Sequence, residues 1–463
     1  MDNSCLSSLI GLHPKLSGSL PHIRRHLQLA WPIALELLLV NLVGVVDVMM
    51  VGSLGDAAIA AIGIANKIIF VLILILVGCA STVGLLAAQY YGGGRLHRVR
   101  NVVLLGSLLG VGLSLTASVI NLFAADTAVA FFTTDPETIR LGGDYMTIVV
   151  PSMMMLALIM AFESALRSLG QVKVPLTISA STVFFNVLFN YWFIFGGLGV
   201  PPLGVLGAAL GTLLARTIQL SLFLAFFYIS KHDLRFRRSD LQHFFAEANI
   251  PKFLGLALPA AGGFAIWSFG ILAYQYVFGH MGTQAIAVVT LVHAVEGVLM
   301  SVFVGLAIAC SIVVGQHLGA GDFLQARREA LRNIVLMPVI SLAIGLVIIA
   351  SKSLILGLFF DLPADTRNQA NVLLVVLGLL HWLKVANMTM AHGVLRAGGR
   401  NMTCLVTDAI GMWGVGIPLV FVAGLIFQWP LVWVFLLAFS EEVSKLFIYV
   451  YHFRKGVWLR QLD

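Results

Sequence analysis

The chain has 463 residues, of which 59% are hydrophobic and only 11% are charged, and its mean hydropathy is +0.98. Soluble globular domains carry about 25% charged residues, so this composition excludes a soluble globule and indicates a polytopic membrane protein. The net charge of +7 does not indicate a nucleic-acid partner, because no soluble domain is visible on which the basic residues would form a patch.

Runs of about 20 apolar residues, long enough to span a bilayer as helices, recur twelve times along the chain. Several exceed what a hydrocarbon core of about 30 Å requires, so we expect tilt or bends. The sequence thus predicts an all-α polytopic membrane protein with twelve transmembrane helices. These cover residues 27–52, 57–91, 99–124, 138–165, 174–197, 203–230, 251–279, 283–318, 329–351, 367–395, 402–427 and 430–453.

The first span, LQLAWPIALELLLVNLVGVVDVMMVG, carries Glu36 and Asp47 among apolar residues. An Asp at the centre of a membrane helix costs about 2.5–3.5 kcal/mol on insertion scales, so such a residue usually faces a cavity and binds ions or substrate. Asp47 is therefore the first functional candidate. Glu36 lies 11 residues earlier and within about 20° of the same helical face, and both a functional and a structural role are open for it.

Further polar residues lie within the later spans. Asn186 and Asn190 share one face of the fifth span, where two amides can ligate a cation or hold a carboxylate, although Asn also links membrane helices. Glu296 and Lys384 lie deep in the eighth and tenth spans, and they can pair across the second half of the chain.

Other charged residues are expected to form structural ion pairs. Glu163 precedes Arg167 by four residues, which is one helical turn. Near the end of the chain, Glu441 or Glu442 can meet Lys445 in the same way.

The distribution of Lys and Arg predicts the topology. The connections on the side of the N-terminus hold most of the basic residues, whereas those on the other side hold only Arg140, Lys352 and Arg367. By the positive-inside rule, both termini are expected in the cytoplasm, with an even number of spans between them.

The two halves of the chain repeat each other. VGSLGDAAIAAIG begins at residue 51 and aligns with FGHMGTQAIAVVT at 278, and AAQYYGGGRLHRVRN at 87 aligns with VGQHLGAGDFLQARR at 314, both at an offset of 227 residues. This pattern indicates a duplicated six-helix unit, with parallel repeats and a site between them. The expected divisions are a cytoplasmic segment 1–26, an N-lobe 27–230, a cytoplasmic linker 231–250, a C-lobe 251–453 and a cytoplasmic tail 454–463.

No GxxxxGK[ST] motif occurs, so the sequence does not predict ATP binding, and HExxH and GxSxG are also absent. The sequence therefore favours a transporter energised by an ion gradient over an enzyme or a primary pump. Such a protein needs a group that binds a cation in one conformation and releases it in another, and a carboxylate in a partly dry cavity can do so.

Several stretches resemble the multidrug and toxic compound extrusion (MATE) family of secondary transporters. They are VVDVMMVGSLGDAAIAAIG in the first two spans, LRSLGQVKVP after the fourth, NVLFNYWFIFGGLGVPPLGVLGAALGT through the fifth and sixth, and GVLRAGGRN before the eleventh. With the twelve-helix layout, the resemblance covers essentially the whole chain. It implies a V-shaped pair of pseudo-symmetric six-helix lobes, and an antiporter that exports organic cations in exchange for H+ or Na+.

The resemblance also implies roles for single residues. Asp47 matches the aspartate of the first helix that the family uses for coupling. Asn186 and Asn190 match a polar pair on the fifth helix, as in the NorM-type branch, and Tyr145 matches a tyrosine that lines the same pocket. Further candidates for ion coupling and substrate binding are Glu36, Phe70, Thr212, Glu296 and Lys384.

The second half departs from the NorM-type branch. That branch has acidic residues on helices 7 and 10 of its second half. They have no counterpart in this sequence, since no Asp or Glu occurs at 254–279 or 368–395. The repeat partner of Asp47 is Tyr274. We therefore expect ion coupling in the N-lobe alone, by H+ or by Na+ held at Asp47 and the two amides of the fifth span, with no firm metal site.

These observations predict an antiporter of the inner (plasma) membrane that exports lipophilic organic cations. We expect a monomer in the lipid bilayer, with no cofactor besides the coupling ion and no nucleic-acid partner. A lipid-linked precursor flippase of the same superfamily is the alternative. It would require a groove lined with several cationic residues, and only Lys67, Arg216 and Lys384 lie within the spans.

Overall fold

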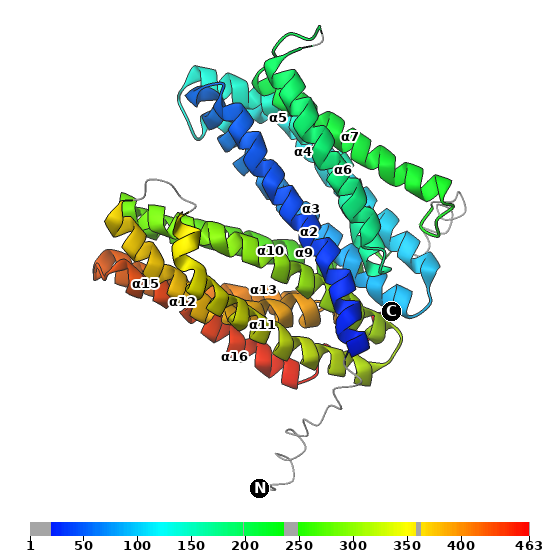
Figure 1. The fold of residues 1–463 in the computed structure, drawn as a ribbon. Coiled ribbons are helices and arrows are strands. Elements are labelled where there is room, and N and C mark those ends of the chain that lie inside the picture. Colours follow the sequence, from blue (N-terminus) through cyan, green and yellow to red (C-terminus); the bar gives the residue numbers. More distant parts are fainter. Residues whose placement is uncertain (1–19, 198, 236–248, 358–362, 463) are drawn as a thin grey trace.

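The computed structural model describes residues 20–197, 199–235, 249–357 and 363–462, and over these residues the regular structure is helical apart from one isolated β-bridge (Figure 1). The predicted all-α fold is confirmed. The first half contains α2 (Leu20–Gly52), α3 (Asp56–Gly92), α4 (Leu96–Ala130), α5 (Pro136–Ser168), α6 (Lys173–Phe195) and α7 (Val205–Ile229). The second half contains α9 (Ile250–His280), α10 (Thr283–Gly319), α11 (Phe323–Gly357), α12 (Ala364–Met388), η2 (Thr389–Leu395), α13 (Asn401–Asp408), η3 (Ala409–Gly416), α14 (Ile417–Phe421), η4 (Val422–Ile426), α15 (Leu431–Ala438) and α16 (Ser440–Arg454).

Eleven helices within the described residues are long and apolar enough to cross a membrane. Two of them contain π-helical turns: η2 continues α12, and η3 and η4 alternate with α13 and α14 over residues 401–426. The twelfth predicted span is present as two shorter helices, α15 and α16, which part at Phe439. Its second half carries Glu441, Glu442 and Lys445, and these charged side chains are buried inside the helix bundle.

The predicted helix ends differ most from the structure at α4 and α11. We expected residues 99–124 and 329–351, whereas the helices cover 96–130 and 323–357. The additional turns are of mixed polarity, as in FLQARR at the start of α11. A helix continues past its apolar run because its backbone hydrogen bonds do not depend on apolar side chains.

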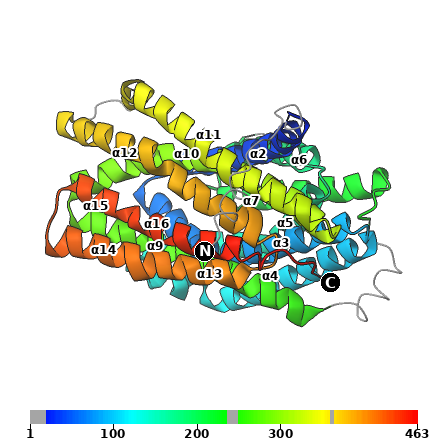
Figure 2. The ribbon, with the colours of Figure 1, turned by 90° about the horizontal axis from the view of Figure 1, so that it is seen from below.

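The helices form two groups, α2–α7 and α9–α16, that diverge at one end of the molecule and meet at the other (Figure 1). The most extensive contacts between the groups are made by α2 and α3, which pack on α10, and α3 also packs on α9. Figure 2, seen from below, places α2 beside α10 and α6. The Asn41 amide donates to the Ser301 hydroxyl across the contact between α2 and α10, at 3.1 Å.

Small residues allow the two groups to meet closely. A Cβ atom on Gly319 of α10 would lie 1.8 Å from the carbonyl oxygen of Gln89, and one on Gly92 of α3 would lie 2.0 Å from that of Gln316. Backbones therefore touch at this crossing, as membrane helices do where small residues face each other.

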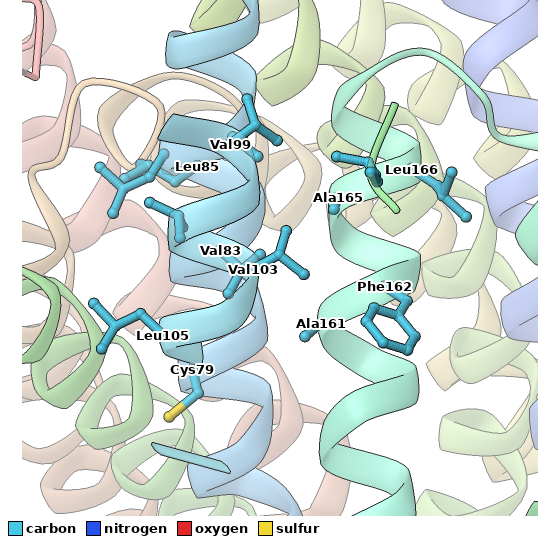
Figure 3. Close-up of a cluster of buried hydrophobic side chains, with 14 of the residues drawn as sticks. Cys79, Val83, Leu85, Val99, Val103, Leu105, Ala161, Phe162, Ala165 and Leu166 are labelled. Atoms are coloured by element: carbon cyan, nitrogen blue, oxygen red, sulfur yellow. The ribbon is translucent and has the colours of Figure 1, made fainter. Parts of the chain in front are cut away.

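The interior of the first group is an apolar cluster from α3, α4 and α5, which includes Val83, Val103 and Phe162 (Figure 3). Phe253 of α9 belongs to the same cluster, so apolar packing also crosses between the two groups. Inside a bilayer such contacts contribute mainly through close van der Waals packing, because lipid tails are as apolar as the side chains.

Candidate functional site

Asp47 lies near the end of α2 and contacts the polar pair of α6. The Asn190 amide nitrogen donates to Asp47 Oδ1 at 2.7 Å and also lies 3.3 Å from Asn186 Oδ1. Asn190 is 1% exposed, whereas Asp47 is only partly buried. The structure thus brings together the three residues that the sequence singles out for ion coupling.

A glycine of α7 determines how closely α6 and α7 approach beside this contact. A Cβ atom on Gly211 would lie 2.1 Å from Asn190 Oδ1, so only a glycine fits at this position without displacing the amide. Asn190 Oδ1 is buried and has no hydrogen-bond partner among the described residues. The Asn190 side chain is therefore held with its amide nitrogen toward Asp47.

Tyr145 of α5 is buried nearby, and its hydroxyl lies 3.5 Å from Asn66 Oδ1 of α3. Asn66 was missed at the sequence level, although it is a lone amide in the apolar run IGIANKIIF. Phe70, one turn further along α3, is 44% exposed. The Thr212 hydroxyl donates back to the Ala208 carbonyl at 3.0 Å, within its own helix.

Arg216 of α7 is a partly buried cation whose charge acts on this group. One of its terminal nitrogens donates to the Ser152 hydroxyl and lies 3.8 Å from the Met153 sulfur, both on α5. Its guanidinium interacts electrostatically with both Asp47 and Tyr145. At the sequence level Arg216 was counted only among the cations within the spans, because its distance from Asp47 depends on how α2 and α7 pack.

Glu36 occupies a different place from Asp47. Arg167 of α5 lies 2.8 Å from Glu36 Oε1 and 3.4 Å from Glu163 Oε2, so the predicted pair of Glu163 and Arg167 is present and Glu36 joins it. The Ser179 hydroxyl lies 3.1 Å from Glu36 and 3.2 Å from Glu163, and Gln219 donates to Glu163 at 3.2 Å. This buried network links α2, α5, α6 and α7.

The second half contains its own pair of a partly buried lysine and a buried carboxylate. Lys384 Nζ lies 2.5 Å from Glu296 Oε1, which confirms that the two residues pair, and it also lies over the Phe439 ring at 5.1 Å. His293 Nε2 lies 3.9 Å from Glu296 Oε2. Glu296 lies on α10 and Lys384 on α12, so this pair belongs to the other group of helices from Asp47.

The position equivalent to Asp47 in the repeat also meets a carboxylate. Tyr274 of α9 donates its hydroxyl to Glu441 Oε2 of α16 at 2.7 Å, and Glu441 lies 3.4 Å from Lys445, as predicted for that pair. The Glu442 carboxylate accepts from the Asn387 amide at 2.7 Å. The sequence search for acids on helices 7 and 10 missed this group, because its carboxylates come from the twelfth span.

Comparisons with known proteins agree over most of the chain. The family model described as MatE matches residues 32–192 and 259–422. The Multidrug resistance protein NorM of Burkholderia vietnamiensis is 29% identical over 442 residues, which cover 92% of this chain and 92% of that protein. An Uncharacterized transporter, YisQ, of Bacillus subtilis is 25% identical over 437 residues, 94% of each chain. A solved structure described as the outward-facing conformation of a multidrug resistance MATE family transporter aligns with a TM-score of 0.80 over 94% of this chain and 95% of the other, at 18% identity.

Proposed function

Because the chain belongs to the MATE family of membrane transporters, we propose that it is a secondary multidrug efflux antiporter that exports lipophilic organic cations. A relative of almost the same length is named as a multidrug resistance protein, which supports export of drugs. The coupling ion in this proposal is H+, and Asp47 of the N-lobe binds it. We assign the N-lobe to 27–230, the linker to 231–250 and the C-lobe to 251–453.

The contact between Asp47 and Asn190 is the observation that carries the proposal. A carboxylate that accepts a hydrogen bond from a buried amide is held in one place on a largely apolar part of its helix. When Asp47 is ionised it attracts a cationic substrate, and when it is protonated that attraction is lost. Substrate and proton therefore compete for one charge, which is the differential affinity that an antiport cycle requires.

The orientation of the Asn190 amide favours H+ over Na+. Na+ is held by oxygen ligands, like other hard cations, whereas Asn190 directs its amide nitrogen at both Asp47 and Asn186. A Na+ ion at these three residues would require the Asn190 side chain to turn over. Na+ therefore stands second to H+ as the coupling ion.

Both termini lie on the cytoplasmic side in our proposal, as the basic connections indicate. The end at which the two groups of helices meet then faces the cytoplasm, and the end at which they diverge faces outward. Asp47, in the outer half of α2, would take up its proton from the outside in this conformation.

The flippase alternative receives less support. A lipid-linked precursor carries phosphate groups, so its groove would need several free cations. Lys384 is already paired with Glu296 at 2.5 Å. The name of the NorM relative also indicates drug export.

The test uses purified protein in proteoliposomes, with ethidium efflux driven by an imposed pH gradient or, separately, by a Na+ gradient. We expect the pH gradient to drive efflux, and Asp47→Asn to abolish this coupling. Asp144→Asn is the matched control, since it makes the same chemical change at an exposed carboxylate of α5 that pairs with Arg140. Transport by Asp47→Asn at the rate of the parent under either gradient would exclude the mechanism.

A further inference from the structure

A groove lies between α2 and α6 on the outer surface of the first group of helices. The two helices run side by side along one edge of the molecule (Figure 2). The groove has a volume of about 660 Å³, and Trp31 and Phe184 on its walls are 51% and 64% exposed. Its apolar lining includes Trp31, Leu35, Leu39, Ala180, Phe184 and Phe185. The groove therefore presents apolar surface to the hydrocarbon of the bilayer.

The two helices that form the groove run in the same direction and in constant register. The contact of Glu36 with Ser179 and that of Asp47 with Asn190 both join residues 143 positions apart in the chain. The groove lies beside the first of these contacts. Its level in the membrane can therefore be followed from one helix to the other.

Lys173 lies at one end of this groove, which is the cytoplasmic end in the topology proposed above. It is the first residue of α6, and the common register places it about level with Trp31. It precedes Thr177, Ala180 and Phe184 by 4, 7 and 11 positions, so it lies on the helical face that lines the groove. Its side chain is exposed and forms no hydrogen bond or ion pair with any residue that the structure describes. Lysine and tryptophan at the end of a membrane helix are typical of the headgroup level.

The hydroxyl groups in the groove are already used within α6. Thr177 donates to the Lys173 carbonyl at 2.8 Å, and Ser181 donates to the Thr177 carbonyl at 2.9 Å. The walls therefore match a ligand that is apolar along its length. A charge on that ligand would have to be negative and lie at the end where Lys173 supplies an ammonium group.

From this arrangement we propose that the groove binds an anionic phospholipid of the cytoplasmic leaflet, with an acyl chain between α2 and α6 and the phosphate at Lys173. Basic residues at the cytoplasmic face of membrane proteins attract anionic headgroups. A lipophilic organic cation fits the apolar walls too, but the charge of Lys173 repels it. The inference goes beyond the proposed function, because it assigns a ligand to the surface that faces the bilayer and not to the site of Asp47.

The test uses the purified protein in detergent, titrated with phospholipids that carry bromine atoms on their acyl chains, since bromine quenches tryptophan fluorescence only at close range. The added lipid is either phosphatidylglycerol, which is anionic, or phosphatidylcholine, which has no net charge. The chain has eight tryptophans, so the signal of Trp31 is the difference between each protein and its Trp31→Phe variant. We expect half-maximal quenching at an about fivefold lower mole fraction of phosphatidylglycerol than of phosphatidylcholine, the range for one lysine beside an anionic lipid.

Three variants locate the lipid. Lys173→Gln should remove the preference for phosphatidylglycerol and leave quenching by phosphatidylcholine unchanged. Lys231→Gln is the matched control, since it makes the same change at an exposed lysine that follows α7 and lies outside the groove. This control should keep the preference. Ala180→Phe places a large side chain in the groove and should weaken quenching by both lipids.

Each other outcome overturns the inference. Equal quenching by the two lipids in the parent would mean that the groove does not select an anion. An equal loss of preference in Lys173→Gln and Lys231→Gln would indicate an effect of general surface charge. Quenching that Ala180→Phe leaves unchanged would place the lipid elsewhere near Trp31. If tetraphenylphosphonium, a lipophilic cation, displaces the brominated phosphatidylglycerol, the groove binds drugs and not this lipid.

Discussion

Asn190 is the residue on which the environment of Asp47 depends most directly. It donates to the Asp47 carboxylate at 2.7 Å, and hydrogen bonds to charged groups contribute about 1.5–3 kcal/mol. We therefore expect Asn190→Ala to lower the initial rate of gradient-driven ethidium efflux by about tenfold or more. Asn186→Ala is the matched comparison, since Asn186 accepts a hydrogen bond from the neutral Asn190 amide, at 3.3 Å, and the loss of activity should be smaller. Equal losses in the two variants would contradict the role given to Asn190.

For single residues, the sequence indicates which ones are unusual for a membrane span, but it does not indicate which of them lie close together in the fold. Asp47 and Asn190 are identified because a polar residue in an apolar span is rare and costly. The proximity of Arg216 to Asp47 and the contact of Tyr145 with Asn66 are not predictable in this way. Both depend on the rotation of each helix about its axis, which is determined by packing against its neighbours.

Among the helices, the buried network around Arg167 should be a major source of stability. Removing one partner of a buried ion pair leaves an uncompensated charge and typically costs about 3–5 kcal/mol. Arg167→Leu leaves Glu36 and Glu163 without their cation, so we expect a clearly lower apparent melting temperature in detergent. Arg140→Leu is the control on the same helix, because Arg140 also pairs with an acid four residues away but is exposed, where such pairs contribute about 0–1 kcal/mol. A similar loss in both variants would show that the network does not stabilise the helix contacts.

The helices themselves follow from hydropathy, whereas their interruptions do not. The apolar runs place eleven spans close to where the structure has them. The break in the twelfth span at Phe439 could not be predicted from the sequence, because residues 430–453 form one apolar stretch with a charged end. Its charged half is acceptable in the interior because Glu441 meets Tyr274 and Lys445, and those partners come together only in the folded bundle.

For the whole molecule, the internal repeat predicts two groups of helices but not the conformation in which they are found. That conformation depends on contacts at the end where the groups meet. His26 of α2 lies 3.0 Å from Glu329 of α11, and the Arg25 side chain donates to Gln316 of α10 at 2.9 Å. These contacts must break if the molecule is to open at this end, as alternating access requires.

Gln89 of α3 makes two of these contacts with one side chain. Its amide nitrogen donates to the Ala397 carbonyl at 2.7 Å, and its oxygen accepts from the Leu462 backbone at 2.8 Å. Gln89→Ala removes both, at about 0.5–1.5 kcal/mol for each, so it should shift the population toward the conformation open at this end by about fivefold or more. Spin labels at Phe131→Cys and Leu354→Cys, exposed at the diverging ends of α4 and α11, should then report a larger fraction of short distances.

The control for this prediction is Gln461→Ala. Gln461→Ala also removes a hydrogen bond to a backbone carbonyl, that of Gly319 at 2.6 Å. Gly319 is the last residue of α10 and Gln461 follows α16, so this contact lies within the second half of the chain and does not involve α3. We expect its distance distribution to match that of the parent. If Gln461→Ala shifts the distances as much as Gln89→Ala does, anchoring of the final residues, rather than the contact between the two groups, determines which end is closed. If neither variant shifts them, the close approach of the glycines in α3 and α10 is sufficient to hold this end together without Gln89.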